Sequence, residues 1–269
     1  KNGWYEFHLR LVGDDIKENI EKRIALNVPQ IQKSSNSVIV DKQGRTLING
    51  KKFLPIGLFF NQMGPSFTAS GNYWRQEEFD NLKDSPFNCI MPYDAMLWKR
   101  KGSPLKGLAE TCAIMDELNR IGIKVIFSLK DIGIHTGWDQ LDGHKGVDAV
   151  TRYIVGNLRN HPALLAWYLN DEQPAKRFYR EQRERIARLD PWHPTWQCHY
   201  NVIEMPRVAG ESDIFGVDPY PISDKNSDMS IIKLYFENAK KIFASEYGTA
   251  IWGVIQIFSF SNYDKKRPY

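Results

Sequence analysis

The chain has 269 residues, enough to bury one large core, or one large domain with a small appended segment. Hydrophobic residues make up 42% of it and charged residues 25%, which is the usual balance of a globular domain. No apolar run approaches the ~20 residues that a membrane-spanning helix needs. The net charge is only +4 and the basic residues are scattered among acids, so binding to nucleic acid is not expected.

Cysteine and histidine spacing argues against a metal site or a disulfide framework. Cys89, Cys112 and Cys198 lie far apart, in two predicted strands and one predicted helix, and are expected to be small buried hydrophobic residues. His135 and His144 are nine residues apart, and no HExxH pattern occurs. The GxSxG, GxGxxG and P-loop patterns are also missing, so we expect no metal, nucleotide or other cofactor.

The first part of the chain differs from the rest. In residues 1–37, the runs WYEFHLRLV and KRIALNVPQ predict two strands joined by polar residues. Two strands alone are only marginally stable in water, so this segment is predicted to complete, or to be the remnant of, a β-sandwich. Residues 38–269 form the second predicted domain. It opens with SVIVDKQGRTLINGKKF, two short strands in which Asn49-Gly50 signals a hairpin, expected to close the bottom of the domain.

From Phe53 onward, short apolar runs alternate with helical segments. The predicted strands are residues 53–60, 88–94, 124–131, 164–172, 195–200, 213–220 and 252–260. The alternation predicts a parallel sheet with right-handed crossovers. Seven such strands predict an α/β protein with a (β/α)8 TIM barrel that is incomplete at its C-terminus, and we expect the chain to be part of a longer protein.

In a barrel of this kind, the C-terminal ends of the strands meet on one rim, where active sites lie. Polar and aromatic residues follow the predicted strands and their loops: Asn61, Tyr93, Asp94, Trp98, Trp138, Asn170, Asp171, Glu172, His199, Tyr200, Asp218, Tyr220 and Gln256. Aromatic rings beside carboxylates and amides suit a carbohydrate, because its ring faces stack on them and its hydroxyls form hydrogen bonds. Trp98 and Trp138 could instead only anchor their loops.

Glu172 is the leading catalytic candidate. It ends the run LLAWYLNDEQP, which has the apolar character of a strand buried on both faces. Because side chains alternate along a strand, Glu172 is expected to point into the groove and Asp171 to turn away toward backbone donors. The alternative is that both acids begin the next helix, where the helix dipole favours negative charge.

Several segments resemble the clan A superfamily of glycoside hydrolases, whose barrels are often preceded by a β-sandwich. These are INGKKFLPIGLFF, HPALLAWYLNDEQP, DPWHPTW, DIFGVDPYPI and WGVIQIFSF, and the resemblance covers residues 46–269. It implies that Glu172 is the general acid/base. The chain departs from the pattern at Asp171, which replaces an asparagine, and at Gln173, which separates Glu172 from the proline. The family's strand-seven nucleophile is a glutamate, whereas this chain has Gln256, a neutral amide.

The sequence therefore predicts a secreted or periplasmic glycoside hydrolase acting on a β-linked oligo- or polysaccharide. Glu172 would donate the proton and Asp218 would be the second carboxylate, at the longer separation that inversion requires. Asp218 could instead only hold the DPYP turn. The rim residues named above would contact the sugar. The alternative functions are a catalytically silent carbohydrate-binding barrel and a structural domain of a larger glycan-processing protein.

Overall fold

The computed structural model describes residues 3–11, 20–28, 34–60, 76–92, 107–134, 139–222, 227–244 and 249–258. The chain divides into two compact units, Lys1–Lys33 and Ser34–Tyr269. In the first unit, β1 (Gly3–Leu11) pairs in antiparallel fashion with β2 (Ile20–Val28). Both predicted strands are confirmed, and their membership of a β-sandwich stays a prediction.

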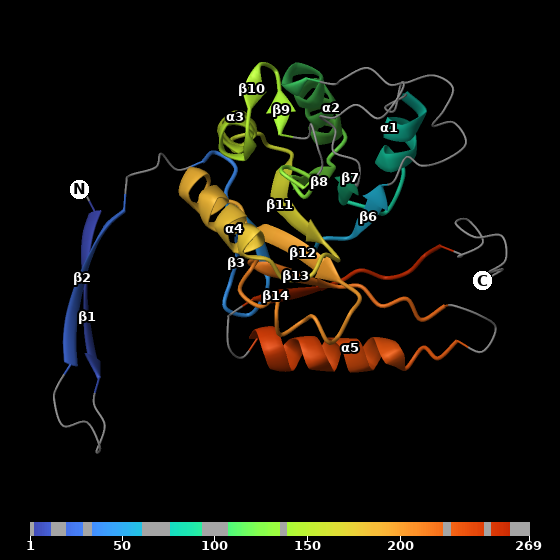
Figure 1. Ribbon diagram of the computed structural model, residues 1–269. Coiled ribbons are helices and arrows are strands. Elements are labelled where there is room, and N and C mark those ends of the chain that lie inside the picture. Colours follow the sequence, from blue (N-terminus) through green and yellow to red (C-terminus); the bar gives the residue numbers. More distant parts are fainter. Residues whose placement is uncertain are drawn as a thin grey trace. The chain divides into compact units, whose positions relative to one another are not determined.

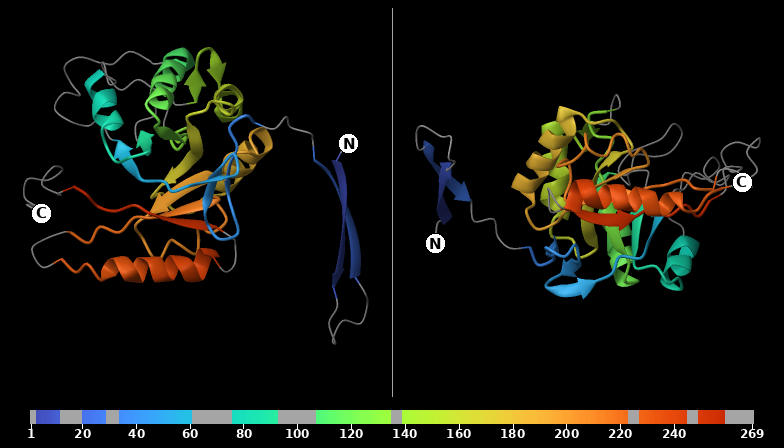
Figure 2. Two further views of the ribbon diagram at one scale, coloured as in Figure 1. Left: turned by 180° about the vertical axis from the view of Figure 1, so that it is seen from behind. Right: turned by 90° about the horizontal axis from the view of Figure 1, so that it is seen from below.

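The second unit is built on a parallel sheet of seven strands (Figure 1). The strands are β6 (Gly57–Phe60), β7 (Cys89–Pro92), β8 (Lys124–Ser128), β11 (Leu164–Asp171), β12 (Thr195–His199), β13 (Ile214–Val217) and β14 (Ala250–Gly253). They lie side by side in chain order, and each neighbouring pair is parallel. The sheet curls into a half barrel, with β6 and β14 at its edges in the part of the chain that the structure describes (Figures 1 and 2). The predicted α/β class is confirmed.

The last strand lies earlier than the sequence predicts. We expected a strand over residues 252–260, whereas β14 begins at Ala250 and ends at Gly253. Residues 254–258 continue without strand pairing, so Gln256 lies beyond the strand rather than on it.

Helices cover the outer face of the sheet. They are α1 (Gln76–Lys83), α2 (Leu108–Arg120), α3 (Val147–Leu158), α4 (Arg177–Leu189) and α5 (Ile231–Ala239), which continues into the π-helical turn η2 (Lys240–Ala244). The spacing of Val150, Tyr153, Ile154 and Leu158 in α3 predicts one buried face; Val150, Ile154 and Leu158 are fully buried, whereas Tyr153 is only partly buried. None of the described helices is long and apolar enough to cross a bilayer.

The inner face of the sheet is closed below by a small antiparallel sheet. Its strands are β3 (Val38–Val40), β4 (Thr46–Ile48) and β5 (Lys51–Phe53), one strand more than we predicted, and they pair in the order β3-β4-β5. The turn between β4 and β5 contains Asn49 (φ 49°) and Gly50 (φ 80°), two left-handed residues of the kind a two-residue hairpin requires. Val38 packs against the inner residues Met91 and Trp196, which completes the interior core.

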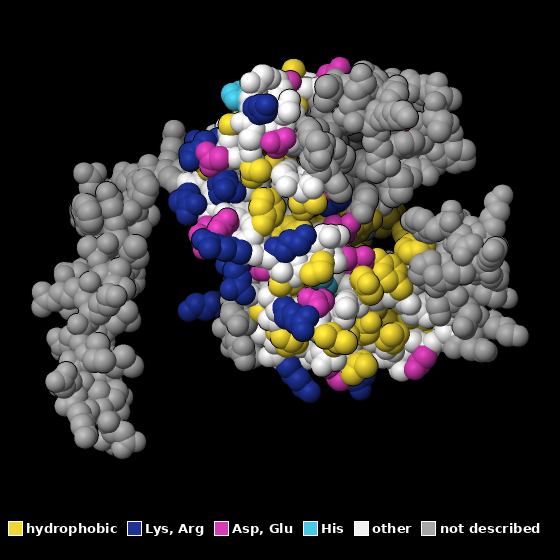
Figure 3. All heavy atoms as spheres, viewed as in Figure 1, with side chains coloured by type: hydrophobic (Ala, Val, Ile, Leu, Met, Phe, Trp, Pro, Cys, Tyr) yellow, Lys and Arg dark blue, Asp and Glu magenta, His cyan; other side chains and the backbone are white. Residues whose placement is uncertain are grey.

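Helix α4 carries many basic residues, and acids lie among them (Figure 3). Arg177 pairs with Glu181 at 2.7 Å within the helix. Arg183 reaches Asp213 at 2.6 Å on the segment before β13. The first pair joins residues four apart on one helix face, and the second joins the helix to the sheet layer.

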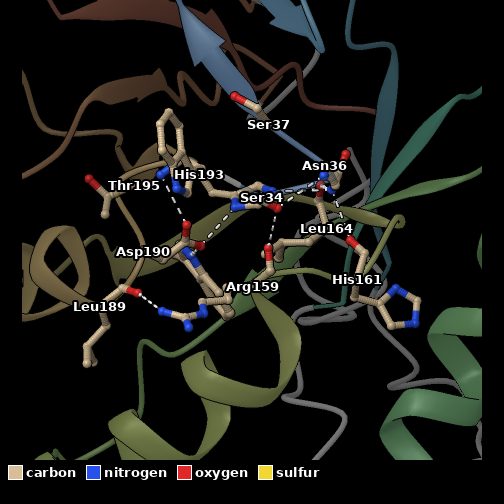
Figure 4. Close-up of polar contacts among 12 residues, drawn as sticks. Ser34, Asn36, Ser37, Arg159, His161, Leu164, Leu189, Asp190, His193 and Thr195 are labelled. Atoms are coloured by element: carbon tan, nitrogen blue, oxygen red, sulfur yellow. Dashed lines mark hydrogen bonds and ion pairs between the residues drawn. The ribbon is translucent and has the colours of Figure 1, made fainter. Parts of the chain in front are cut away.

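A buried polar network joins residues 34–37 to the bottom of the sheet (Figure 4). The side-chain nitrogen of Asn36 lies 2.9 Å from the carbonyl oxygen of His161, 2.7 Å from that of Leu164 and 3.2 Å from Nε2 of His193. Nδ1 of His193 faces the Asp190 carboxylate, which can only accept, so Nδ1 donates to it at 2.8 Å. The side chains of His193 and Asp190 are 0% exposed. Within this buried network, the Asn36 amide donates to the carbonyl oxygens of His161 and Leu164.

Replacing Asn36 by alanine should therefore lower the free energy of unfolding by about 2–3 kcal/mol, since buried acceptors lose their donor. Urea-induced unfolding of the purified chain measures this loss. Ser35→Ala changes an exposed neighbour and serves as the control, with an expected effect within about 0.5 kcal/mol. An Asn36→Ala variant as stable as Ser35→Ala would contradict the anchoring role.

Candidate functional site

The turn after β11 brings a glutamate to the C-terminal edge of the sheet. Asn170 holds this turn, because its Oδ1 accepts from the backbone N–H of Gln173 and its Nδ2 donates to the Gln173 carbonyl, both at 3.0 Å. Glu172 lies within the turn and adopts φ 56°, a left-handed conformation that is unusual for a residue other than glycine. Such backbone strain is concentrated at functional sites.

Two carboxyl groups share one hydroxyl at this edge. The hydroxyl oxygen of Tyr220 lies 2.8 Å from Oε1 of Glu172 and 2.8 Å from Oδ2 of Asp218. A hydroxyl has a single hydrogen, so it can donate to only one of the two carboxylates. The second contact is satisfied when the other carboxyl is protonated and donates to the hydroxyl oxygen. The geometry thus suits a pair that holds one proton.

The electrostatic surroundings agree with this assignment. Burial raises the pKa of Glu172 to about 8, and the charges of Asp218 and Asp171 add to the rise, partly offset by the hydrogen bond from Tyr220. Burial also raises the pKa of Asp218 to about 6, while its hydrogen bonds to Tyr220 and Glu172 oppose the rise. Both groups therefore favour the protonated form more than an exposed carboxyl does, and the rise in pKa is larger for Glu172.

The close contact contradicts the predicted long separation of Glu172 and Asp218. Because both carboxyl oxygens lie 2.8 Å from one hydroxyl, they cannot be farther apart than twice that distance. The two side chains are also hydrogen-bonded to each other, which leaves no room between them for the water that an inverting pair admits at a separation of roughly 6.5–9.5 Å. The distance predicted from the sequence was based on the spacing between strands. It did not include Tyr220, two residues after Asp218, whose hydroxyl contacts both carboxyl groups.

Asp171 also faces the inside of the sheet, so our prediction that it turns away was wrong. Its Oδ1 accepts a 2.5 Å hydrogen bond from the hydroxyl of Tyr168, a residue of the inner core. The pairing of β11 with β12 shifts register between Tyr168 and Asn170. This irregularity interrupts the alternation of side chains, and Asp171 consequently points to the same face as Tyr168.

Two other predicted substrate contacts lie on the outer face, Asn170 because of this shift and His199 because of the regular alternation along β12. Asn170 and His199 are each 1% exposed, and their side-chain nitrogens are 3.3 Å apart. The His199 ring stacks on Phe215, whose side chain packs against η2. Burial lowers the pKa of His199 to about 4, so the ring is neutral. These residues support the turn and the outer layer rather than line the groove.

Gln256 is engaged with the backbone. Its Oε1 accepts from the N–H of Ile222 at 3.0 Å, and its Nε2 donates to the carbonyls of Ile222 and Phe258 at 3.0 and 3.2 Å. All the hydrogen-bonding positions of the amide nitrogen are thereby used. Gln256 joins the segment after β13 to the segment after β14, and a sugar contact would require these bonds to break.

Two aromatic residues stand beside the shared hydroxyl. The rings of Tyr200 and Phe258 lie 6.0 and 5.9 Å from the ring of Tyr220, measured between centroids. Tyr200 is 46% exposed, and its contact with a sugar stays a prediction. Tyr220 itself bridges the carboxyls. The other predicted contacts, Asn61, Tyr93, Asp94, Trp98 and Trp138, lie outside the described residues, as does His135.

Sequence reasoning passed over one further carboxylate, Glu246. It follows the apolar residues Ile242, Phe243 and Ala244, and a carboxylate after an apolar run was the available signal. Glu246 lies outside the described residues. Among the residues that the structure does describe, no group of three or more His, Cys, Asp or Glu side chains is arranged to hold a metal ion.

Known protein structures share this fold. A β-D-glucuronidase from Dictyoglomus thermophilum superposes with a TM-score of 0.56 at 16% identity, over 95% of this chain and 44% of that one. A GH2 β-galacturonidase from Eisenbergiella tayi, bound to galacturonate, gives a TM-score of 0.54 at 17% identity, over 88% and 40% of the two chains. A β-glucuronidase from an uncultured Clostridium gives a TM-score of 0.52 at 15% identity, over 92% of this chain and 41% of that one.

At such low identities the likeness is one of fold, and the chain spans less than half the length of each of these proteins. No protein-family model matches the sequence, and no curated protein matches it. The half-barrel fold is therefore one that glycoside hydrolases use.

The raised pKa of Glu172 predicts a pH-dependent cost in stability. A carboxyl whose folded pKa exceeds its unfolded value stabilises the fold below the unfolded pKa of about 4.5, and this contribution disappears as pH rises through about 8. As pH rises from 5 to 9, the free energy of unfolding of Glu172→Gln should therefore increase by on the order of 3 kcal/mol relative to that of the parent chain. Urea unfolding at several pH values measures the difference.

The matched control is Glu184→Gln on α4, whose side chain is 67% exposed. The stability difference between this variant and the parent should stay constant over the same range. If Glu172→Gln behaves like the control, Glu172 is not a buried protonated carboxyl.

Proposed function

We propose that the chain is the catalytic half-barrel of a β-glycoside hydrolase. The observation that carries the proposal is the pair of Glu172 and Asp218, which share the Tyr220 hydroxyl at the C-terminal edge of a parallel sheet. Glycoside hydrolysis requires a protonated and an ionised carboxyl on either side of the scissile bond. The fold shared with a β-glucuronidase and a β-galacturonidase supports a β-linked sugar, and uronides are the first substrates to test.

In this proposal Glu172 is the general acid. Its proton passes to the glycosidic oxygen while the bond from that oxygen to the anomeric carbon breaks. The positive charge that develops on the sugar ring is stabilised by the ionised Asp218. The short separation of the two carboxyls favours retention, in which a carboxylate attacks the anomeric carbon and water later releases the sugar. Tyr200 would support the sugar ring.

A second candidate function is carbohydrate binding without hydrolysis. The amide of Gln256 supports it, because an uncharged side chain bonded to Ile222 and Phe258 cannot act as a nucleophile. Substituting Gln256 by glutamate would also place a carboxylate against two carbonyl oxygens, so we do not expect that substitution to create activity. Binding of β-glycosides with no release of sugar by the parent chain would favour this function.

Glu172→Gln should reduce hydrolysis of 4-nitrophenyl β-glycosides by a factor of about 100 or more, the usual contribution of general acid catalysis. The loss should be much smaller with 2,4-dinitrophenyl glycosides, because that leaving group departs without a proton. Measuring kcat/KM for both leaving groups tests this role, and Glu184→Gln is the control. An equal loss on both substrates would exclude Glu172 as the proton donor.

The second carboxylate can be identified by comparing Asp218→Asn with Glu246→Gln. If Asp218 takes this role, Asp218→Asn should lower kcat by a factor of about 1,000 or more while Glu246→Gln retains most activity. The opposite result would transfer the role to Glu246. Proton NMR of the first-formed product should show the retained β-anomer, and an α-anomer would contradict the role that the short separation suggests.

A further inference from the structure

A short segment after β13 carries Tyr220, and it is held at both of its ends. At its start, the backbone N–H of Asp218 donates to the carbonyl of the last residue of β12 at 3.1 Å. Tyr220 has a proline on each side, and proline has no N–H to donate. Ile222 is therefore the first residue after Tyr220 with a backbone donor, and the position of Tyr220 depends on how Ile222 is fixed.

The side chain of Gln256 fixes Ile222. Its amide accepts from the N–H of Ile222 at 3.0 Å and donates to the carbonyl of the same residue at 3.0 Å, so it pairs with Ile222 as a neighbouring strand would. The amide nitrogen also donates to the carbonyl of Phe258 at 3.2 Å, and the Phe258 ring lies 5.9 Å from the Tyr220 ring between centroids. Gln256 thus restrains the chain after Tyr220 and one of the rings beside it.

This link is made by a side chain alone. The backbone N–H of Val254 donates to the carbonyl of Val217 at 2.8 Å, next to the last paired residues of β13 and β14. Beyond that point, no backbone hydrogen bond joins residues 218–222 to residues 255–258, two stretches that the structure describes throughout. Gln256 is 7% exposed, so water has little access to replace its bonds. An apolar side chain of the same length would fill the space and leave the two segments unjoined.

We propose that Gln256 is a positioning residue, whose amide holds the Tyr220 hydroxyl against Glu172 and Asp218 by pairing with Ile222. Its effect on hydrolysis rests on the function proposed above, whereas its effect on the two carboxyls does not. An ionised glutamate could not take this role, because it has no hydrogen to donate to the Ile222 carbonyl.

Titration of the two carboxyls reports where the Tyr220 hydroxyl lies. Burial raises the pKa of Glu172 and of Asp218, and the hydrogen bonds of Tyr220 oppose that rise, so Tyr220→Phe should raise both midpoints. Asp171 and Cys198 also face the pair, and they stay unchanged in every variant. NMR of protein labelled with ¹³C in its Asp and Glu carboxyls follows the midpoints, and Glu172→Gln and Asp218→Asn assign the signals.

The decisive variant is Gln256→Met, which keeps the length of the side chain and removes its hydrogen bonds. We expect it to raise both midpoints by about one pH unit, as Tyr220→Phe does, although the hydroxyl is still present. Combined with Tyr220→Phe, it should add no further rise. Gln182→Met is the control and should leave both midpoints unchanged, because Gln182 is a buried glutamine on α4 that bonds Thr151 at 3.1 Å.

Unchanged or lowered midpoints in Gln256→Met, a further rise in the double variant, or the same rise in Gln182→Met would overturn the proposal. The parent chain gives a second test that needs no variant. Its Ile222 amide hydrogen should exchange slowly with solvent, and exchange at the rate of an exposed amide would contradict the bond to Gln256. Both measurements give their answer even if no glycoside is hydrolysed. If hydrolysis occurs, the acidic limb of its pH profile should move to higher pH with the midpoints.

Discussion

A single hydrogen shared between two acids governs the chemistry of this site. Tyr220 contacts both Glu172 and Asp218, and its hydroxyl cannot donate to both. Burial raises the pKa of both carboxyls; the charges of Asp218 and Asp171 raise that of Glu172 further, whereas hydrogen bonds to Tyr220 and Glu172 hold that of Asp218 lower. An acid and a base are thus produced from two similar side chains by their surroundings alone, which is the general way in which enzymes separate such roles.

This arrangement carries a cost in stability that the fold must offset. A left-handed residue such as Glu172 costs about 1–2 kcal/mol, and buried carboxyls oppose folding as pH rises. The turn is held by the paired hydrogen bonds of Asn170, and Trp196 and Tyr168 fill the space below it. The strained segment therefore follows a strand, β11, that is buried over almost its whole length and pairs with the fully buried β12.

The two faces of the sheet divide the polar residues into distinct groups. Asp171, Cys198 and Asp218 lie on the inner face, where they interact with one another. Asn170 and His199 lie on the outer face, under the helical layer. The register shift in β11 determines the faces of Asn170 and Asp171, and the regular alternation along β12 determines those of Cys198 and His199. A site assembled from strand ends is thus sensitive to a single irregularity.

The sequence by itself determined the class of fold and the main candidate. Apolar runs at regular intervals identified the strands, since a parallel sheet buries both of its faces. The position of Glu172 at the end of one run followed from the same pattern. Asn49-Gly50 located a turn, because few other residues accept left-handed conformations.

The tertiary structure decided which side chains meet. No sequence pattern reports the register shift that turns Asp171 inward, or the bonds that commit Gln256 to Ile222. The contact of Tyr220 with Glu172 joins residues 48 positions apart in the chain. Such contacts depend on strand register and on the path of the loops, which are set by packing between distant segments. The local sequence restricts which contacts are possible, and the packing of the folded chain determines which of them form.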